Sequence, residues 1–428
     1  MKIAYIVDVF PNLSSDTFIL NQITGLLDRR CEVDIYAKIA LGGDQLQPDV
    51  IKYKLLDWTF YYDMEMPKNM LLRIIKAFSL IIRNLRNKPI SLLKSLNIFK
   101  FGKEALSLKL LYATVPFLDK GPYDVIHCHF GPNGSLGVRL RELGIFKSPI
   151  ITTFQGYDIR LALEEGAGIY KRLFREGDVF LSICDYNYKK LISFGVDKER
   201  IVYHPVGIDL AQFQYKWNSE DLTEDKKIKV LTVARLVRVK ALENGIMAIN
   251  KIHLEHPDID LEYNIVGDGY LTQELTQLIQ DLKLEKIVHL LGPKKQNEIV
   301  NILRSSHIFV LPSLAEALPV SLMEAQAVGL PVIATDVGSV DEVLVMDESG
   351  YCVPASDVEA IAEKLYLLIV NPWKWPIMGR IGRKNIEDNF NIDILNDRLL
   401  DLCKSLLNED IWHKAGYGHY KVRYNNTI

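Results

Sequence analysis

Short apolar runs alternate with helix-length segments from one end of the chain to the other. In the first half these runs are KIAYIVDVF, CEVDIYAK, YDVIHCHF, SPIITTF, DVFLSIC and RIVYHPV. In the second half they are IKVLTVAR, DLEYNIVGDG, IVHLLG, HIFVLPS, LPVIATD and SGYCVP. Apolar strands that alternate with crossover helices are typical of buried parallel sheets with helices on both faces. The pattern therefore predicts an α/β protein with two doubly wound sheets, one after the other.

The length of the chain also favours two domains. Its 428 residues exceed the size of about 250–300 residues at which a single hydrophobic core stops growing. Residues 210–227, LAQFQYKWNSEDLTEDKK, are polar and aperiodic, which predicts a linker. We therefore expect an N-terminal domain at 1–209, this linker, a C-terminal domain at 228–390, and a helical segment at 391–428 that crosses back to the first domain.

Composition and cysteine content are those of an ordinary globular protein in a reducing compartment. Hydrophobic residues make up 48% of the chain and charged residues 25%, which argues against disorder. The five cysteines are odd in number, scattered and without a CxxC pair, so we expect reduced thiols rather than disulfides or a zinc site. The start, MKIAYIVDVF, lacks the features of a signal peptide, and the sequence predicts a cytoplasmic protein.

Two glutamates, Glu316 and Glu324, interrupt the apolar stretch EALPVSLMEAQAVGLPVIAT. A proline suits the first turn of a helix, so we expect a helix at 319–328, with Glu316 in the loop before it and Glu324 inside it. Free backbone amides and the helix dipole make such a start suitable for an anionic or hydroxyl-rich ligand. The alternative is that Glu316 caps the helix and Glu324 is a solvated surface residue. The predicted seat for such a ligand is the loop and helix start at Ala317, Leu318, Pro319 and Val320.

Two further loops at strand ends carry groups suited to phosphate. VLTVARLVRVKAL places Arg235 and Lys240 between a strand and a helix, where a guanidinium binds phosphate as a fork and an ammonium as a point charge. In IVGDGY, Gly267 and Gly269 allow close backbone approach, although the third glycine of a dinucleotide fingerprint is missing. Ligands bind at the carboxyl ends of strands in such sheets, so these loops predict a diphosphate site. Taken singly, both cations could be ordinary surface charges.

In their order along the chain, these motifs resemble the retaining glycosyltransferases of the GT4 type, which have the GT-B fold. The C-terminal half contributes Arg235 with Lys240, GDG at 267–269, LG at 291–292, and Glu316 eight positions before Glu324. The N-terminal half resembles the branch that builds exopolysaccharides such as colanic-acid-like polymers, through VFPNLSSDTFILNQI, VIHCHFG, TTFQGYDI and VYHPVGIDL. The resemblance implies two Rossmann-like domains that face each other across a cleft.

The resemblance also implies an activity. It is the transfer of a sugar, with retention of configuration and without a metal or other cofactor, from a UDP- or GDP-linked donor to a growing, lipid-linked glycan of a surface polysaccharide. In such enzymes the equivalents of Arg235 and Lys240 hold the diphosphate, that of Glu324 holds the ribose, and that of Glu316 holds the transferred sugar. The loops at Gly267 and at 317–320 complete the donor site. The alternatives are a membrane-docked scaffold that binds nucleotide without catalysis, and another enzyme of this fold, such as an epimerase.

Three positions depart from the family pattern. Gln155 stands where the family has the histidine of TFHG. Because an amide cannot take up a proton near neutral pH, general-base catalysis from this position is excluded. Ala241 replaces the glycine that usually follows the diphosphate lysine. The usual glycine-rich loop after the first strand is FPNLSSDTF here, and side-chain contacts to the ligand are expected from Ser15, Asp16 and Thr17.

Two histidines in VIHCHF, His127 and His129, alternate along a strand and therefore share one face. His129 lies nearer the strand end, so together with Asp158 and Gln155 it is our candidate for the acceptor side of the active site. A zinc site lacks a third ligand at a sensible spacing. The further alternative is a pair of hydrogen-bonded structural histidines.

Residues 68–109 carry ten Lys or Arg residues and one acid, Glu104, whereas the rest of the chain has 41 basic and 53 acidic residues. Leu, Ile and Phe are interleaved with these cations, which predicts amphipathic helices suited to an anionic membrane surface. We therefore expect peripheral attachment to the inner face of the cell membrane. Nucleic acid is not expected as a partner, because it has no use for the apolar residues. The alternative is that the apolar stripe packs on the N-terminal sheet and the charges are merely solvated.

Overall fold

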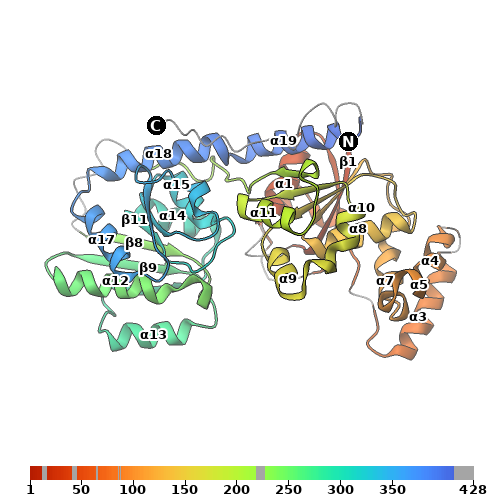
Figure 1. Ribbon diagram of the computed structural model, residues 1–428, viewed down its shortest axis with the longest axis horizontal. Helices are drawn as coiled ribbons and strands as arrows, with labels where there is room; N and C mark the ends of the chain where they lie inside the picture. The colour runs from red at the N-terminus through yellow and green to blue at the C-terminus, as the bar shows by residue number, and fades with distance from the viewer. Residues whose placement is uncertain are drawn as a thin grey trace. The chain divides into compact units, whose positions relative to one another are not determined.

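The computed structural model describes residues 1–11, 17–40, 46–63, 66–84, 86, 88–217 and 227–408. It divides into two compact units (Figure 1). The first unit comprises 1–183, 187–204 and the chain from Asn396 onward, and the second comprises 184–186 and 205–395. Each unit is built on its own sheet.

Among the described residues, the sheet of the first unit has seven parallel strands in the order β3-β2-β1-β4-β5-β6-β7. They are β1 (Lys2–Val9), β2 (Glu32–Ile39), β3 (Thr59–Tyr61), β4 (Val125–His129), β5 (Ile150–Phe154), β6 (Val179–Ser182) and β7 (Ile201–Tyr203). The central strand β1 pairs with both β2 and β4, so that Ile3 lies opposite Val33 and Val125. All six apolar runs predicted in the first half are strands, and the short edge strand β3 was not predicted.

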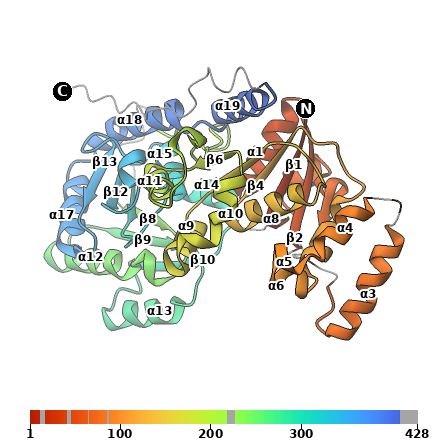
Figure 2. The same ribbon diagram turned by 45° about the vertical axis from the view of Figure 1, so that its right-hand side comes forward.

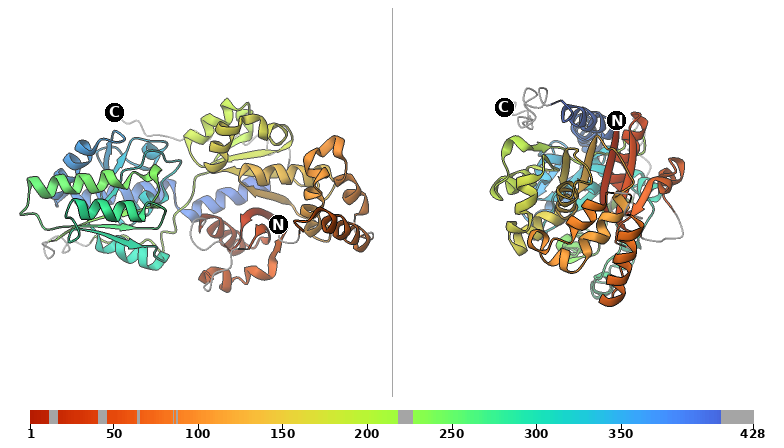
Figure 3. Two further views of the ribbon diagram at one scale, coloured as in Figure 1. Left: turned by 90° about the horizontal axis from the view of Figure 1, so that it is seen from below. Right: turned by 90° about the vertical axis from the view of Figure 1, so that its right-hand side faces the viewer.

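Both faces of this sheet are covered, as the sequence predicts. Along β1, Ile3 and Tyr5 belong to one buried cluster, whereas the alternate residues Ala4 and Ile6 belong to another. The covering helices are α1 (Thr17–Asp28), α2 (Pro48–Lys52), α3 (Met70–Arg83), α4 (Pro89–Ser95), α5 (Ile98–Phe101), α6 (Lys103–Leu106), α7 (Lys109–Thr114), α8 (Gly131–Glu142), α9 (Tyr157–Glu165), α10 (Lys171–Glu176) and α11 (Asp185–Ser193). Figures 2 and 3 show α3 and its neighbours gathered at the outer edge of the first unit.

Within the described chain, the sheet of the second unit has six parallel strands in the order β10-β9-β8-β11-β12-β13. They are β8 (Ile228–Val233), β9 (Leu261–Val266), β10 (Val288–Gly292), β11 (Ile308–Leu311), β12 (Val332–Thr335) and β13 (Gly350–Val353). The helices are α12 (Leu242–Glu255), α13 (Thr272–Asp281), α14 (Gln296–Ser305), α15 (Val320–Val328), α16 (Val340–Val343), α17 (Val358–Ile369), α18 (Lys374–Asn389) and α19 (Ile392–Ser405). All six apolar runs predicted in the second half are strands.

Strand order reverses at the same place in the two sheets. β1 lies beside β4 in the first sheet, and β8 lies beside β11 in the second. The loops that leave two such strands at their carboxyl ends diverge to opposite faces of the sheet and leave a crevice for a ligand. Two doubly wound, Rossmann-like units are therefore confirmed, and the order of the strands locates the crevice of each.

The boundaries differ from the predicted ones at the linker. Phe213 is only 2% exposed and Trp217 only 8%, and the Trp217 indole N–H donates to the carbonyl of Gly329. The first part of the predicted linker, 210–217, therefore packs into the second unit, and 218–226 lie outside the described residues. The linker was predicted from the polar composition of the whole stretch, which does not show that two of its aromatic residues are buried.

The last described helix, α19, contributes residues to both units. Its first residues belong to the second unit, and its residues from Asn396 onward belong to the first. There Leu399, Leu402 and Cys403 join the buried cluster that also contains Ile23 and Val33. The C-terminal segment thus supplies core residues to the unit that begins the chain.

Candidate active site

The loops at the carboxyl edge of the second sheet are tied together by backbone hydrogen bonds. The Leu236 N–H donates to the Asp268 carbonyl at 2.9 Å, which joins the loops after β8 and β9. The Leu314 N–H donates to the Val239 carbonyl at 2.7 Å, which joins the loops after β8 and β11. These loops contain the predicted donor-site residues of the second unit, so residues 80 positions apart in the chain form one surface beside the reversal point.

Lys240 and Glu316 form the central contact of this surface. The Lys240 Nζ lies 2.5 Å from Glu316 Oε1, and the two side chains are only 16% and 8% exposed. Ser313 Oγ donates to the same oxygen at 2.6 Å. Among the described residues, the other oxygen of Glu316 has no partner and can accept a hydrogen bond from a sugar hydroxyl. The structure therefore pairs the predicted phosphate cation with the predicted sugar-binding carboxylate, a contact that the sequence did not reveal.

Arg235 is an exposed cation of the same loop. The residue comes soon after the end of β8, and no carboxylate in the described chain pairs with its guanidinium. Five N–H donors are thus available for a phosphate. Ala241, which replaces the family glycine, has φ 43° and ψ 45°, and this left-handed conformation costs about 1–2 kcal/mol for a residue with a Cβ atom. The backbone here keeps the shape that favours glycine.

Helix α15 begins within one residue of its predicted start and ends as predicted before Gly329, which has φ 96°. Pro319 is its N-cap rather than its first helical residue. In the described chain the backbone N–H groups of Ala317, Leu318 and Val320 have no hydrogen-bond partner. These three donors and the positive end of the helix dipole are available to an anionic ligand.

Glu324 lies in the second turn of α15 and is half-buried among apolar neighbours. Burial raises the pKa of its carboxyl group from 4.5 to about 8, because the charged form is poorly solvated there. In the described chain it has no hydrogen-bond partner. This environment argues against the alternative that Glu324 is a solvated surface residue. A half-buried carboxyl group without a partner is instead suited to a ligand that brings its own donors.

This raised pKa predicts a pH dependence of nucleotide binding. The sequence predicts that Glu324 holds the ribose, and two ribose hydroxyls donate best to a carboxylate, so binding at pH 7 should release close to one proton from Glu324. Affinity for a nucleoside diphosphate is therefore expected to rise from pH 6 to about 8. The effect of Glu324 on folding stability has the opposite sign. The folded state favours the neutral acid, so this contribution to stability is lost as the pH rises through about 8.

Calorimetry in buffers of different ionisation enthalpy measures the released proton directly. Glu324→Gln keeps the shape of the side chain and removes its titration, so its affinity should be flat across this pH range. An equal pH dependence in the wild type and in Glu324→Gln would show that another group titrates.

The loop after β9 approaches the loop after β8 as closely as its glycine permits. Gly267 has φ 144°, and a Cβ atom there would lie 1.9 Å from the Ala234 carbonyl oxygen. No L-residue fits this contact without moving the backbone. The close approach predicted from GDG is therefore present, although its partner is the neighbouring loop.

Three residues that support the Glu316 loop were missed by sequence reasoning. Ser313 is fully buried and bonds the Glu316 carboxylate, while Thr335 Oγ1 donates to the Ser313 carbonyl at 2.5 Å. Gly338 has φ 61°, and a Cβ atom there would lie 1.7 Å from the Glu316 carbonyl oxygen. A glycine soon after a strand, in TDVGS, was the available signal, but its contact lies 22 positions away in the chain.

In the first unit, Gln155 and His129 meet at the carboxyl ends of β4 and β5. Gln155 Nε2 lies 2.8 Å from His129 Nδ1, and an amide nitrogen can only donate, so Nδ1 accepts. His129 is fully buried, and burial lowers its pKa to about 3. The imidazole is therefore enclosed by the protein in this structure, and its predicted place on the acceptor side stays a prediction. It holds the amide so that Oε1 remains available to a ligand.

Asp158 is held by backbone hydrogen bonds on both of its carboxylate oxygens. Its Oδ1 accepts hydrogen bonds from the backbone N–H groups of Gln155, Gly156 and Ile159 at 2.9–3.0 Å. Its Oδ2 accepts from the N–H of Gly131 at 3.1 Å. The side chain is fully buried. Asp158 therefore fixes the loop that presents Gln155, and its predicted place on the acceptor side stays a prediction.

The two histidines of β4 share a face, as predicted, with ring centroids 4.6 Å apart. His127 Nε2 lies 2.8 Å from Thr153 Oγ1, so one ring nitrogen of each histidine already has a protein partner. Within the described chain there is no cluster of three or more metal-ligand side chains. The arrangement favours the interpretation as structural histidines.

The expected N-terminal contacts lie at the edge of the described chain. Thr17 is the first residue of α1, next to the carboxyl end of β1, and its side chain is half-buried. Ser15 and Asp16 lie outside the described residues. Their predicted contacts stay predictions.

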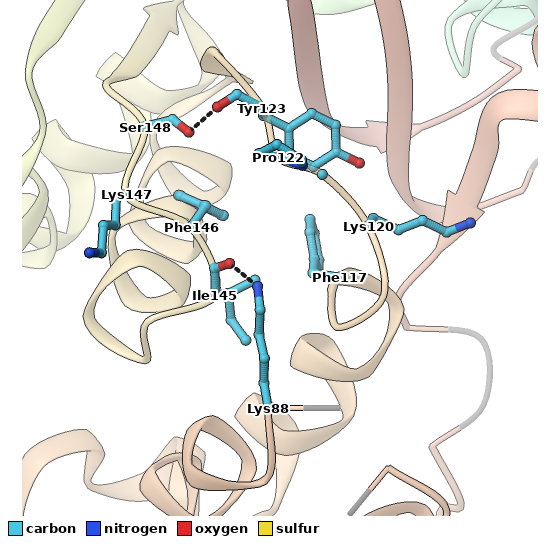
Figure 4. A pocket seen from close by; sticks show the side chains of 10 residues that line it. Lys88, Phe117, Lys120, Pro122, Tyr123, Ile145, Phe146, Lys147 and Ser148 are labelled. Atoms are coloured by element: carbon cyan, nitrogen blue, oxygen red, sulfur yellow. Dashed lines mark hydrogen bonds between the residues drawn. The ribbon is translucent and has the colours of Figure 1, made fainter. Parts of the chain in front are cut away.

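One pocket of about 470 Å³ lies at the opposite edge of the first sheet (Figure 4). Its lining residues precede β4 and β5 in the chain, so it opens at the amino ends of these strands. Lys88 Nζ donates to the Ile145 carbonyl, and Lys120 Nζ lies 4.2 Å from the centre of the Phe60 ring. In Figure 4 the ammonium groups of Lys120 and Lys147 point away from the pocket. None of the predicted site residues lines it.

The chain has two Rossmann-like units, and the second carries cations, carboxylates and a free helix start at the point where its strand order reverses. This combination defines a glycosyltransferase of the GT-B fold. Residues 16–212 match the family described as Glycosyltransferase Family 4, and residues 214–385 match Glycosyl transferases group 1. The chain is 32% identical over 416 residues to the colanic acid biosynthesis glycosyltransferase WcaL of Escherichia coli K12, with 95% of this chain and 100% of the relative covered. The chain belongs to glycosyltransferase family 4, as the sequence motifs predict.

Further relatives and solved structures agree. The amylovoran biosynthesis glycosyltransferase AmsK of Erwinia amylovora is 32% identical, with 95% of this chain and 100% of the relative covered. An Escherichia coli UDP-Gal:alpha-D-GlcNAc-diphosphoundecaprenol alpha-1,3-galactosyltransferase is 29% identical over 69% of this chain and 79% of its own length. The structure of Anabaena HepE in complex with UDP-glucose superposes with a TM-score of 0.66 at 15% identity, with 95% of this chain and 100% of that chain covered. At this identity the superposition confirms the fold alone.

Proposed function

We propose that this glycosyltransferase moves a sugar, with retention of configuration and without a metal ion, from a nucleotide diphosphate sugar to a growing, lipid-linked glycan of a surface polysaccharide. The observation that carries the proposal is the buried Lys240–Glu316 pair beside the exposed Arg235 and the free amides of α15. The polysaccharide context follows WcaL and AmsK. The lipid-linked acceptor follows the galactosyltransferase whose acceptor is a diphosphoundecaprenol.

In the proposed mechanism, these residues act on the leaving diphosphate. When the bond between the anomeric carbon and the phosphate oxygen breaks, negative charge collects on the diphosphate. Arg235, two N–H donors of Lys240 and the backbone N–H groups of Ala317, Leu318 and Val320 would stabilise that charge. A metal ion performs this task in other enzymes. Glu316 would hold the transferred sugar through its free oxygen, and Glu324 the ribose.

The proton of the acceptor hydroxyl needs a base. Of the candidates in the first unit, Gln155 is an amide, His129 is buried behind it, and Asp158 is held by four backbone donors. We therefore propose front-face attack, in which the acceptor oxygen bonds to the anomeric carbon on the side that the phosphate leaves and the leaving phosphate oxygen takes the proton. This geometry retains the configuration of the donor sugar.

We also propose that the protein works at the cytoplasmic face of the cell membrane, held peripherally by an anionic surface. The support is the excess of basic residues at 68–109 and the lipid carrier named for the galactosyltransferase relative. No helix in the described part of the chain is long and apolar enough to cross a bilayer.

Thermal unfolding in the presence of UDP, GDP, NAD and a panel of nucleotide sugars tests the donor assignment. A ligand at 100 times its dissociation constant adds about 2.7 kcal/mol to stability, so one nucleoside diphosphate should raise the unfolding midpoint by several degrees and one of its sugar conjugates by more. Arg235→Ala should abolish the shift, whereas the exposed neighbour variant Arg238→Ala should keep most of it. Stabilisation by NAD instead, or by no nucleotide, would contradict the proposal.

A further inference from the structure

The helix α3 turns an apolar stripe away from the protein. Leu71, Ile75, Phe78 and Ile82 are 67%, 58%, 63% and 64% exposed, and their spacing of four, three and four residues places them on one face of the helix. Four turns of helix thus leave their largest apolar side chains without cover. Three further apolar residues of α3 are 38–57% exposed, namely Met70, Leu72 and Ile74, of which Met70 is 45% exposed.

The opposite face of α3 is the one that packs. Ala77 is buried, and Leu80 and Ile81 pack against the core of the first unit. Arg73 Nη1 donates to the Ser107 carbonyl at 3.1 Å, and Tyr112 Oη donates to the Arg73 carbonyl at 2.8 Å. Helix α3 is therefore attached to the fold, and only its apolar stripe faces outward. The interpretation that the apolar stripe packs on the sheet is wrong for α3.

Apolar exposure continues on the helices beside α3. Figures 1 and 2 both draw α4 and α5 next to it at the outer edge of the first unit. Ile90 and Leu93 of α4 are 66% and 59% exposed, and Phe99 of α5 is fully exposed. Exposed large apolar side chains gathered on neighbouring helices mark an interaction site.

The charge around the stripe selects the partner. Lys68 precedes α3, Arg83 ends it and Arg86 follows it, and all three are exposed. The one acid of the segment, Glu104, is held by Arg139 at 2.8 Å. An isologous contact with a second copy of the chain would bring two such cationic surfaces together, which is unfavourable. An anionic lipid surface offers both hydrocarbon for the stripe and negative charge for its borders.

We infer that α3 lies in the plane of an anionic bilayer surface with Leu71, Ile75, Phe78 and Ile82 inserted among the lipids. Its 14 residues span about 21 Å at 1.5 Å per residue, so the helix lies on the membrane and does not cross it. The inference rests on the membrane attachment in the proposed function and deepens it: insertion of apolar side chains, and not charge alone, holds the enzyme to the lipid. Binding is then partly resistant to salt.

Co-sedimentation of the full chain with lipid vesicles, without donor or acceptor, tests this inference. Wild-type protein should bind vesicles that contain phosphatidylglycerol more tightly than pure phosphatidylcholine vesicles, and should keep part of that binding at high salt. Ile75→Ser with Phe78→Ser should weaken binding about 100-fold, since burial of each large apolar side chain is worth about tenfold. The matched control is Leu254→Ser, because Leu254 is 70% exposed on α12.

The outcomes separate this inference from the proposed function. Nucleotide-induced stabilisation in the double variant shows that the variant is folded. Loss of that stabilisation in the wild type would count against the donor assignment and not against this inference. Equal binding by the wild type and the double variant would overturn the inference, as would binding that high salt abolishes. A dimer that the double variant dissociates, without vesicle binding by the wild type, would assign the stripe to a second copy and also overturn it.

Discussion

Replacing Glu316 with glutamine should lower the turnover number about 100- to 1,000-fold, the usual cost of removing one preorganised electrostatic group from a transition state. Affinity for the bare nucleoside diphosphate should change less than about threefold, because Arg235 and the amides of α15 are untouched. The free oxygen of Glu316 is expected to hold the sugar, while the other holds Lys240 and Ser313. Transfer kinetics together with calorimetry of the nucleotide separate the two effects.

The contact between Lys240 and Glu316 adds a second arm to this experiment. Because the two charges lie 2.5 Å apart and are nearly buried, removing either strands the other, so Lys240→Met combined with Glu316→Gln should lose less activity than the product of the single losses. Lys251→Met is the control, since Lys251 forms an ion pair with Glu255 at 3.1 Å on α12 and its loss should leave transfer unchanged. Multiplicative losses would mean that the two residues act independently.

Gly338→Ala should reduce transfer at least 100-fold, although Gly338 contacts no substrate in the proposed mechanism. The new Cβ atom would lie 1.7 Å from the Glu316 carbonyl oxygen, so the Glu316 loop must move, and a displacement of about 1 Å near the chemistry can cost about 100-fold. Nucleotide affinity should fall much less, since Arg235 lies in another loop. Transfer kinetics and nucleotide calorimetry on the purified variant measure both.

The control for Gly338→Ala isolates the collision from backbone strain. Gly195 also has a positive φ, 90°, but a Cβ atom there meets nothing within 4 Å. Gly195→Ala should therefore cost about 1 kcal/mol of folding stability and leave transfer unchanged. If both variants lost transfer equally, strain or instability would explain the effect and the loop argument would fail.

The strands could be predicted because the signal is local, whereas their order in each sheet is seen only in the structure. Each buried parallel strand is a short apolar run, and all twelve runs form strands. The strand β3 escaped because Thr59–Tyr61 is a half-buried edge strand of three residues. The buried Phe213 and Trp217 escaped because they stand in a polar stretch. Periodicity also indicates the two faces of α3 but not which of them meets the core.

The site shows the same division between residue types and contacts. Residue types and spacing at strand ends predicted four site residues, namely Arg235, Lys240, Glu316 and Glu324. The three in the linked loops after β8 and β11 lie on one surface. The roles of His129 and Asp158 depend on hydrogen bonds to Gln155, whose direction no spacing specifies. Gly338 depends on a backbone approach between loops of two adjacent strands, which becomes visible only in the folded chain.

The central claim is retaining transfer from a nucleotide diphosphate sugar by the Arg235, Lys240 and Glu316 site. We would incubate the purified protein with the donor that stabilises it most, an undecaprenyl-diphosphate-linked saccharide and a chelator, and determine the anomeric configuration of the product by NMR. The account predicts a glycoside with the configuration of the donor, formed in the presence of the chelator and lost in Glu316→Gln. An inverted product, or transfer that requires a metal ion, would contradict it.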